Sequence, residues 1–111
     1  MTELRIGVES GETATLVVLH GDLDIATAPE LRDCLAKVIG DGARIVVDLE
    51  AVGFLDSAGL GILVGALKRA RTAGGELELV CTSRDVLKPL EITGLDRVFT
   101  IHPGRDVALG A

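Results

Sequence analysis

The chain has 111 residues and a formal net charge of −6, with 48% apolar, 25% charged and only 2% aromatic residues. This is the composition of one globular domain, 1–111, whose core consists of aliphatic side chains. The acidic balance and the scarcity of aromatic side chains argue against binding to DNA or RNA, which takes basic surfaces and stacking platforms.

No segment is typical of export or membrane insertion. The first residues lack a basic stretch followed by an apolar one, and no apolar run approaches the roughly 20 residues that span a bilayer. We therefore expect a cytoplasmic protein without a membrane partner. Cys34 and Cys81 lie among apolar neighbours with no Cys or His at metal-ligand spacing, which indicates buried thiols. A redox disulfide between them is the alternative.

The first half of the chain predicts a hairpin, a helix and a strand. Two β-rich runs at 4–9 and 13–20 flank a short turn, and Thr27 and Glu30 stand at capping-box spacing before a helical stripe that ends at Gly40. The β-branched run at 44–49 is typical of a strand covered on both faces.

The second half continues the alternation of helices and strands. We expect a turn at 50–55, a helix over 58–73, a strand at 76–81, a short helix from Ser83 to Gly94, a last strand at 98–101 and a tail with a helical turn or two. The order β-β-α-β-α-β-α-β predicts a single α/β domain. Its sheet of about five strands is mostly parallel, with an antiparallel first hairpin and helices packed against it.

The segment at 54–61 bears most directly on function. Ser57 is expected at or beside the N-cap of the second helix, where free N–H groups and the helix dipole tolerate a phosphate. Phosphorylation would add about −1.5 to −2 charges to a rim where Asp22, Asp24 and Asp56 converge. It is therefore expected to change what docks rather than what folds. A plain N-capping serine is the alternative.

Glycines in the second predicted helix indicate a close approach by another surface. Gly59, Gly61 and Gly65 each cost up to about 1 kcal/mol relative to alanine inside a helix. The approaching surface is either a partner or another element of this chain. Ile62 and Ala66 are expected to point away from the buried face and to offer apolar contacts in this region.

Catalytic and metal-binding motifs are incomplete. Ser57 lacks the glycine two residues earlier that a nucleophile elbow needs, and nothing ties His20 or His102 to it. The glycine spacing does not match a dinucleotide loop, and caps and turns account for the aspartates, Asp48 included. We expect no enzymatic activity, no bound metal and no cofactor.

Several stretches together resemble a STAS domain of the anti-sigma factor antagonist family. They are GDLDIATAPELR at 21–32, VVDLEAVGFLDSAGLGILVGALKRAR at 46–71, the glycine pair at 74–75 and ITGL at 92–95. The Asp-Ser-x-Gly-Leu-Gly sequence at 56–61 is specific in this context, and the similarity covers nearly the whole chain.

The resemblance implies a partner switch in bacterial transcription. In that scheme the unphosphorylated protein binds an anti-sigma factor that is also a serine kinase, which then releases its sigma factor. The kinase, using ATP, phosphorylates the antagonist, and a serine phosphatase restores it. The family's phosphorylated serine falls on Ser57, its acidic contact position falls on Asp24, and Ala58 leaves no second acceptor beside Ser57. The expected partner-binding residues are Asp22, Asp24, Thr27, Asp56, Ser57, Ala58, Gly59, Leu60, Gly61 and Ile62.

Two other hypotheses remain open at this point. One is a STAS subunit of a transporter or lipid-transport complex, in which Ser57 is only a cap. The other is a phospho-aspartate receiver or small enzyme, suggested by the acidic turn and by Lys88 and Pro89, although the opening hairpin argues against it. A homodimer is a further candidate assembly.

Overall fold

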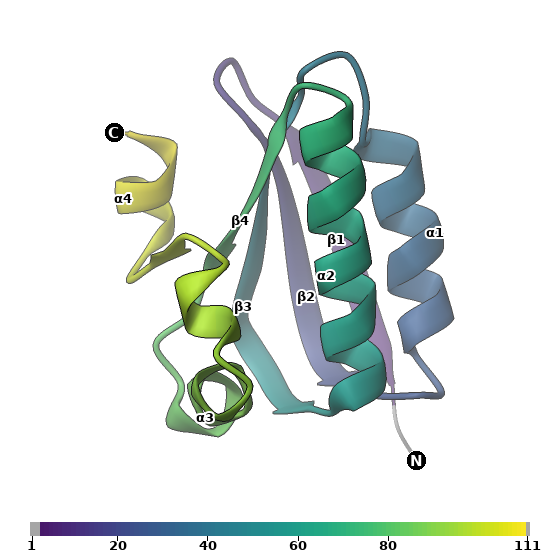
Figure 1. The fold of residues 1–111 in the computed structure, drawn as a ribbon, viewed down its shortest axis with the longest axis vertical. Helices are drawn as coiled ribbons and strands as arrows, with labels where there is room; N and C mark the ends of the chain where they lie inside the picture. The colour runs from purple at the N-terminus through teal and green to yellow at the C-terminus, as the bar shows by residue number, and fades with distance from the viewer. Residues whose placement is uncertain (1–2, 111) are drawn as a thin grey trace.

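The computed structural model describes residues 3–110, which form a five-stranded mixed sheet with helices packed against it (Figure 1). The strand order is β1-β2-β3-β4-β5; β1 runs antiparallel to β2, and the other neighbours are parallel. This confirms the predicted fold class. The strands are β1 (Leu4–Ser10), β2 (Thr15–Leu23), β3 (Arg44–Leu55), β4 (Glu76–Val80) and β5 (Ile101–His102).

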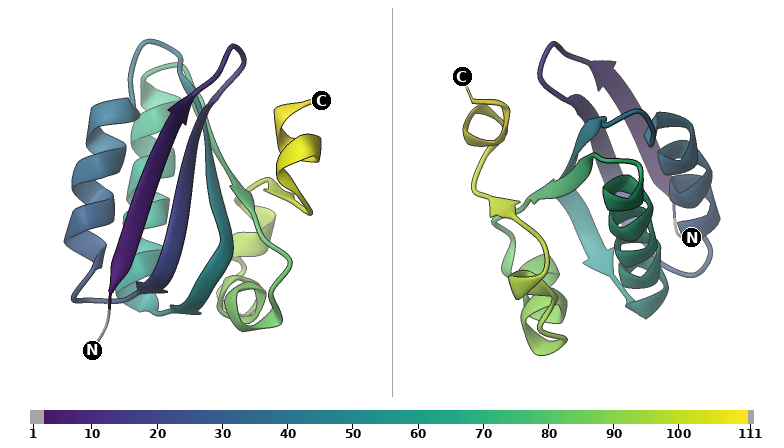
Figure 2. Two further views of the ribbon diagram at one scale, coloured as in Figure 1. Left: turned by 180° about the vertical axis from the view of Figure 1, so that it is seen from behind. Right: turned by 45° about the horizontal axis from the view of Figure 1, so that its top comes forward.

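The helices divide unequally between the two faces of the sheet (Figure 2). They are α1 (Ala28–Val38), α2 (Ser57–Thr72), α3 (Arg84–Ile92) and α4 (Arg105–Leu109), with a 3₁₀ turn at Leu95–Arg97. The first three contribute to the main aliphatic core on one face, whereas Ala108 of α4 packs into a smaller cluster on the opposite face. We call that opposite face the far face.

Charged side chains hold α4 against the far face. The guanidinium of Arg44 donates to both carboxylate oxygens of Glu78, at 2.8 and 2.7 Å, and also to the carbonyl of Ala108 in α4. Nε2 of His102 lies 2.6 Å from Oε1 of Glu78. Arg105, the first residue of α4, pairs with the buried carboxylate of Asp48. These contacts compensate the cost of placing two carboxylates on a covered face.

The strands extend further than the sequence pattern predicts. The expected turn at 50–55 is wrong, because β3 continues to Leu55 alongside β2, which itself continues to Leu23. The register between the two strands shifts twice, between Val18 and His20 and between Gly21 and Asp22, and each shift accommodates one extra residue in β3.

The C-terminal strand, by contrast, is shorter than the sequence pattern predicts. After the 3₁₀ turn at Leu95–Arg97 the backbone at 98–100 is irregular, and only the two-residue strand β5 pairs with β4. Phe99 is nevertheless buried in the main core, so this apolar run covers the core without pairing along its length. The predicted helical turns of the tail are confirmed as α4.

The two cysteines differ in burial, and both are free thiols. Cys81 is buried, and desolvation raises its pKa to about 11. Cys34 is only half-buried, so the expectation of two buried thiols is wrong for Cys34. Within residues 3–110, no helix has the length and apolarity needed to cross a membrane.

Candidate functional site

The expected site residues gather at the end of the sheet where β2 and β3 finish. Leu23 is paired with Leu55 across the two strands, and the N–H of Asp56 donates to the carbonyl of Leu23 at 3.2 Å. Asp24 and Asp56 therefore leave neighbouring parallel strands side by side. The first turns of α1 and α2 start at the same end (Figure 1). We call this region, residues 22–27 and 54–62, the carboxyl edge.

Asp56, not Ser57, caps α2. Its backbone is extended, and Oδ1 accepts from the N–H groups of Ala58 at 2.9 Å and Gly59 at 3.1 Å. An N-cap aspartate also places negative charge at the positive end of the helix dipole. Ser57 is the first helical residue, so the alternative in which it serves as a plain N-cap is wrong.

Asp24 and Thr27 organise the loop between β2 and α1. Oδ1 of Asp24 accepts from the N–H groups of Ala26, at 2.9 Å, and Thr27, at 3.1 Å. The Thr27 hydroxyl donates to the carbonyl of Asp22 at 2.8 Å and accepts from the N–H of Asp24 at 3.0 Å. The capping box predicted for Thr27 and Glu30 is therefore wrong, because the threonine hydroxyl is used to close the loop.

Burial separates the expected partner-binding residues into two groups. Asp24, Thr27, Gly59 and Leu60 are buried, so they shape the carboxyl edge from within. Asp22, Asp56, Ala58 and Ile62 are half-buried, and Ser57 and Gly61 are exposed. A docking protein could reach the second group directly.

The carboxyl edge includes two exposed apolar side chains. Ile25, in the loop after β2, is 79% exposed, and Phe54, one residue before the end of β3, is 51% exposed. Both belong to the carboxyl edge. The sequence analysis does not single them out as site residues, although Ile25 stands in the turn between Asp24 and Thr27, where an aliphatic side chain does not serve the core. An aliphatic residue in a polar turn is therefore the sequence feature that could have identified Ile25.

The three glycines of α2 have different surroundings. A Cβ on Gly59 would lie 2.6 Å from Cγ of Leu23 and 2.9 Å from its carbonyl oxygen, so this glycine lets α2 pack closely on the end of β2. A Cβ on Gly61 would have no atom within 4 Å, and one on Gly65 would make an ordinary contact with Arg69. Close packing within the chain thus explains Gly59 but not Gly61.

The predicted exposure of Ala66 is wrong. Ala66 has no exposed surface and belongs to the main core, because it lies on the same helical stripe as buried Leu63 and Ala70. Ile62 is half-buried and packs partly against the same core. The apolar contact surface of the carboxyl edge therefore consists of Ile25 and Phe54 rather than Ala66.

The carboxyl edge carries negative charge without matching cations. Among residues 3–110, the ion pairs involve neither Asp22, Asp24 nor Asp56. The same range contains no group of three or more His, Cys, Asp or Glu side chains arranged to hold a metal ion. What this arrangement offers is a surface with acidic, hydroxyl and apolar groups, which suits binding to another protein.

Comparisons with known proteins agree with this architecture. The family model for the STAS domain matches residues 5–108. The anti-sigma-B factor antagonist of Staphylococcus aureus is 39% identical over 92 residues, which cover 82% of this chain and 85% of that protein. The crystal structure of an anti-sigma factor antagonist from Mycobacterium paratuberculosis has a TM-score of 0.89 and 32% identity, over 97% of this chain and 92% of that one.

A more distant structure shares the fold. The Bacillus cell fate determinant SpoIIAA, solved in its phosphorylated form, superposes with a TM-score of 0.73 over 96% of this chain and 97% of its own, at 22% identity. The match of the family model over nearly all described residues, together with the two closer relatives, is decisive. This chain belongs to the STAS domain family and is similar to its anti-sigma factor antagonists.

Proposed function

We propose that this protein is an anti-sigma factor antagonist whose unphosphorylated form binds an anti-sigma factor that is also a serine kinase. Binding makes that partner release its sigma factor, and phosphorylation of Ser57 by the partner ends the binding. A serine phosphatase then restores the active form. The protein itself acts by binding and not by catalysis.

The observation that carries the proposal is the exposure of Ser57 at the carboxyl edge, a region that also includes two exposed apolar side chains. A kinase can reach the hydroxyl without unfolding α2, because Asp56 rather than Ser57 caps the helix. Ile25 and Phe54 supply the apolar contact area that a binding surface needs at its centre.

The location of Asp56 also favours a large effect of the phosphate on binding. Its carboxylate already accepts from the N–H groups of Ala58 and Gly59, so a phosphate on Ser57 finds these donors occupied. The added charge of about −1.5 to −2 therefore stays on the surface, beside carboxylates that have no cation partner. A partner would have to desolvate or approach this charge, and a loss of about 3 kcal/mol corresponds to more than a hundredfold weaker binding.

Binding measurements on charge variants test the proposal. We expect Ser57→Ala to bind the cognate anti-sigma kinase like the unchanged protein and to resist phosphorylation, while Ser57→Asp binds about a hundredfold more weakly. Isothermal titration calorimetry and intact-mass analysis after incubation with kinase and ATP measure the two effects.

A matched control separates local charge from net charge. Thr13→Asp adds the same charge at the exposed tip of the first hairpin, outside the carboxyl edge, and is expected to leave binding unchanged. Strong binding by Ser57→Asp, or a phosphate found on another residue while Ser57 stays unmodified, would contradict the proposal.

A further inference from the structure

The outer edge of β1 carries backbone groups that no strand satisfies. Within residues 3–110, β1 is the terminal strand of the sheet, and Figure 2 (left) shows it nearest the viewer with no ribbon crossing in front of it. Such an edge is a template for pairing with another strand. Proteins that keep an edge free usually shorten it or cover it, whereas β1 has seven residues and regular pairing along its whole length with β2.

The hydrogen-bond pattern fixes which residues of β1 face outward. The N–H of Gly11 donates to the carbonyl of Ala14 at 2.9 Å, and the N–H of Asp22 donates to the carbonyl of Glu3 at 3.0 Å. Because pairing alternates along an antiparallel ladder, the odd-numbered residues of β1 bond to β2. The N–H and C=O groups of Leu4, Ile6, Val8 and Ser10 therefore point toward the free edge.

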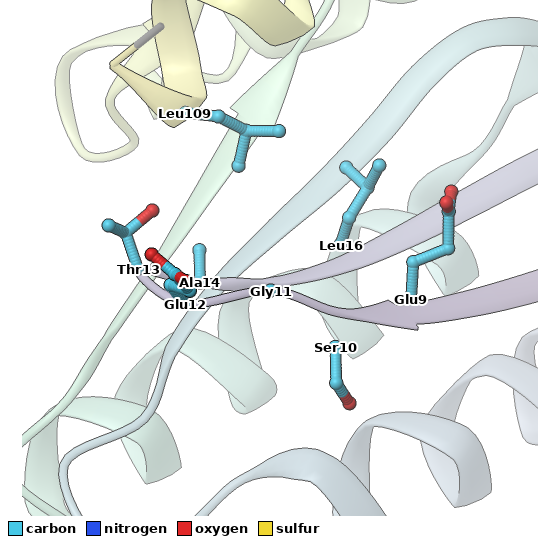
Figure 3. Close-up of a pocket in the computed structure, with 8 residues that line it drawn as sticks. All are labelled: Glu9, Ser10, Gly11, Glu12, Thr13, Ala14, Leu16 and Leu109. Carbon is cyan, nitrogen blue, oxygen red and sulfur yellow. The ribbon is translucent and has the colours of Figure 1, made fainter.

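The charged side chains of β1 are arranged so that two antiparallel copies of the strand would place opposite charges next to each other. The far face of β1 carries every second residue, Arg5, Gly7 and Glu9, and all three are exposed. Figure 3 shows Glu9 on the same side of the hairpin as Leu16, with Ser10 on the opposite side. Neither Arg5 nor Glu9 takes part in an ion pair among the described residues. A second β1 laid antiparallel about a two-fold axis at Gly7 would place each Arg5 opposite the other copy's Glu9.

This register agrees with the backbone. When Gly7 lies on the axis, Ile6 faces Val8 of the second copy, and Leu4 faces Ser10, so the outward N–H and C=O groups form the hydrogen-bonded pairs. Arg5 and Glu9 then fall in the non-hydrogen-bonded pairs, where side chains approach most closely. Moving the axis to Ile6 would set Arg5 against Gly7 and Glu9 against Glu3, which removes the attraction and adds a repulsion.

Apolar contacts on the other side of the strand support the same register. Val8 is 46% exposed, and Ile6 is half-buried beside the main core. Pairing Ile6 with Val8 across the axis, twice, covers apolar surface that the isolated chain leaves in water. Gly7 has open space around its Cβ position, so no side chain blocks the axis.

We propose that two copies of this chain associate through β1, antiparallel and centred on Gly7, so that their sheets form one continuous sheet. The axis lies at the sheet margin, and the carboxyl edges of the two copies point in opposite directions. Each copy therefore keeps its Ser57 surface free for a partner. This inference does not depend on the proposed function.

Charge-reversed variants of the full chain test the register by complementation. Sedimentation velocity of the unchanged protein at increasing concentration should show a monomer–dimer equilibrium. Arg5→Glu alone and Glu9→Arg alone should each dimerise at least about tenfold more weakly, because like charges then face one another twice. An equimolar mixture of the two variants should dimerise again, because each introduced charge then faces its opposite. Recovery in the mixture also shows that both variants are folded.

A cysteine at the axis tests the same geometry by covalent capture. In a Cys34→Ser background, Gly7→Cys should form a disulfide-linked dimer on mild oxidation, because a non-hydrogen-bonded pair brings Cα atoms to about 4.5 Å. Thr13→Cys in the same background, at the exposed hairpin tip, should remain monomeric. A monomer at all concentrations would overturn the proposal, and so would a dimer that both charge reversals leave unchanged and that Gly7→Cys does not link.

Discussion

The carboxyl edge and the far face both contain carboxylates, but the groups that donate hydrogen bonds to these carboxylates differ. At the carboxyl edge, Asp24 and Asp56 accept from backbone N–H groups of the turn or helix that follows each of them. On the far face, Glu78 and Asp48 accept from arginine side chains that come from other elements.

The choice of donor decides what each region can do. Backbone N–H groups satisfy hydrogen bonds without neutralising charge, so the carboxyl edge stays acidic and remains open beside Ile25 and Phe54. Guanidinium groups neutralise the far-face carboxylates and tie α4 to the sheet. One region is therefore suited to binding a partner and the other to closing the fold.

The largest expected effect on stability comes from Glu78. Replacement by Gln leaves the Arg44 guanidinium without its counterion, and we expect Glu78→Gln to lower the free energy of unfolding by about 2 kcal/mol at neutral pH. Hydrogen bonds from Arg44, and then from His102, hold the pKa of Glu78 below its ordinary value of 4.5. Its stabilisation is therefore complete above that value and is lost as the pH falls through the lowered pKa.

Urea unfolding of both proteins across an acidic pH series measures this dependence. The difference between Glu78→Gln and the unchanged protein should narrow below pH 4.5. Glu91→Gln is the matched control, because Glu91 pairs with Arg84 on the surface, where an ion pair contributes little. If both variants lost the same free energy of unfolding, the ion pair on the far face would be no better shielded from solvent than the surface pair on α3.

A smaller effect is expected at the cap of α2. Asp56→Ala should lower the free energy of unfolding by about 1 kcal/mol, because the N–H groups of Ala58 and Gly59 lose their acceptor. Asp56→Asn keeps an acceptor oxygen and should cost less. Ser57→Ala, measured by the same chemical unfolding, should cost nothing detectable; a loss equal to that of Asp56→Ala would make Ser57 part of the cap after all.

The sequence was sufficient for the fold class but not for the local details of the strands and helix caps. The alternation of apolar runs with capped amphipathic stripes predicts the element order, because each pattern depends on neighbours within a few residues. The extension of β3 to Leu55 depends instead on how far β2 continues beside it. Two further details depend on backbone angles: Asp56 rather than Ser57 caps α2, and the hydroxyl of Thr27 closes its own loop. Neighbouring side chains with oxygen atoms could fill either role equally well, so the sequence does not decide between them.

The glycines and Ala66 have mixed outcomes for two different reasons. A glycine-rich helix predicts close approach, but only packing against Leu23 identifies Gly59 as the residue that needs it. Ala66 lies three residues after Leu63 and four before Ala70, so it belongs to the buried stripe of α2. The role of Gly59 is a tertiary detail, whereas the burial of Ala66 follows from helical spacing once Ala70 is counted with the apolar stripe.

The smallest expected change in stability distinguishes a glycine that serves the fold from one that serves a partner. Gly61 is exposed with open space at its Cβ position, so Gly61→Ala should raise the free energy of unfolding by about 0.5–1 kcal/mol through helix propensity. The same methyl group lies one helical turn after Ser57, on the same side of α2, and should weaken binding of the anti-sigma kinase about tenfold if the partner approaches there. Gly59→Ala is the control, because a methyl group would meet Leu23 and lower stability. Chemical unfolding and calorimetry on the two variants separate the effects: a more stable Gly61→Ala that binds unchanged would confine the partner contact to Ile25, Phe54 and Ser57.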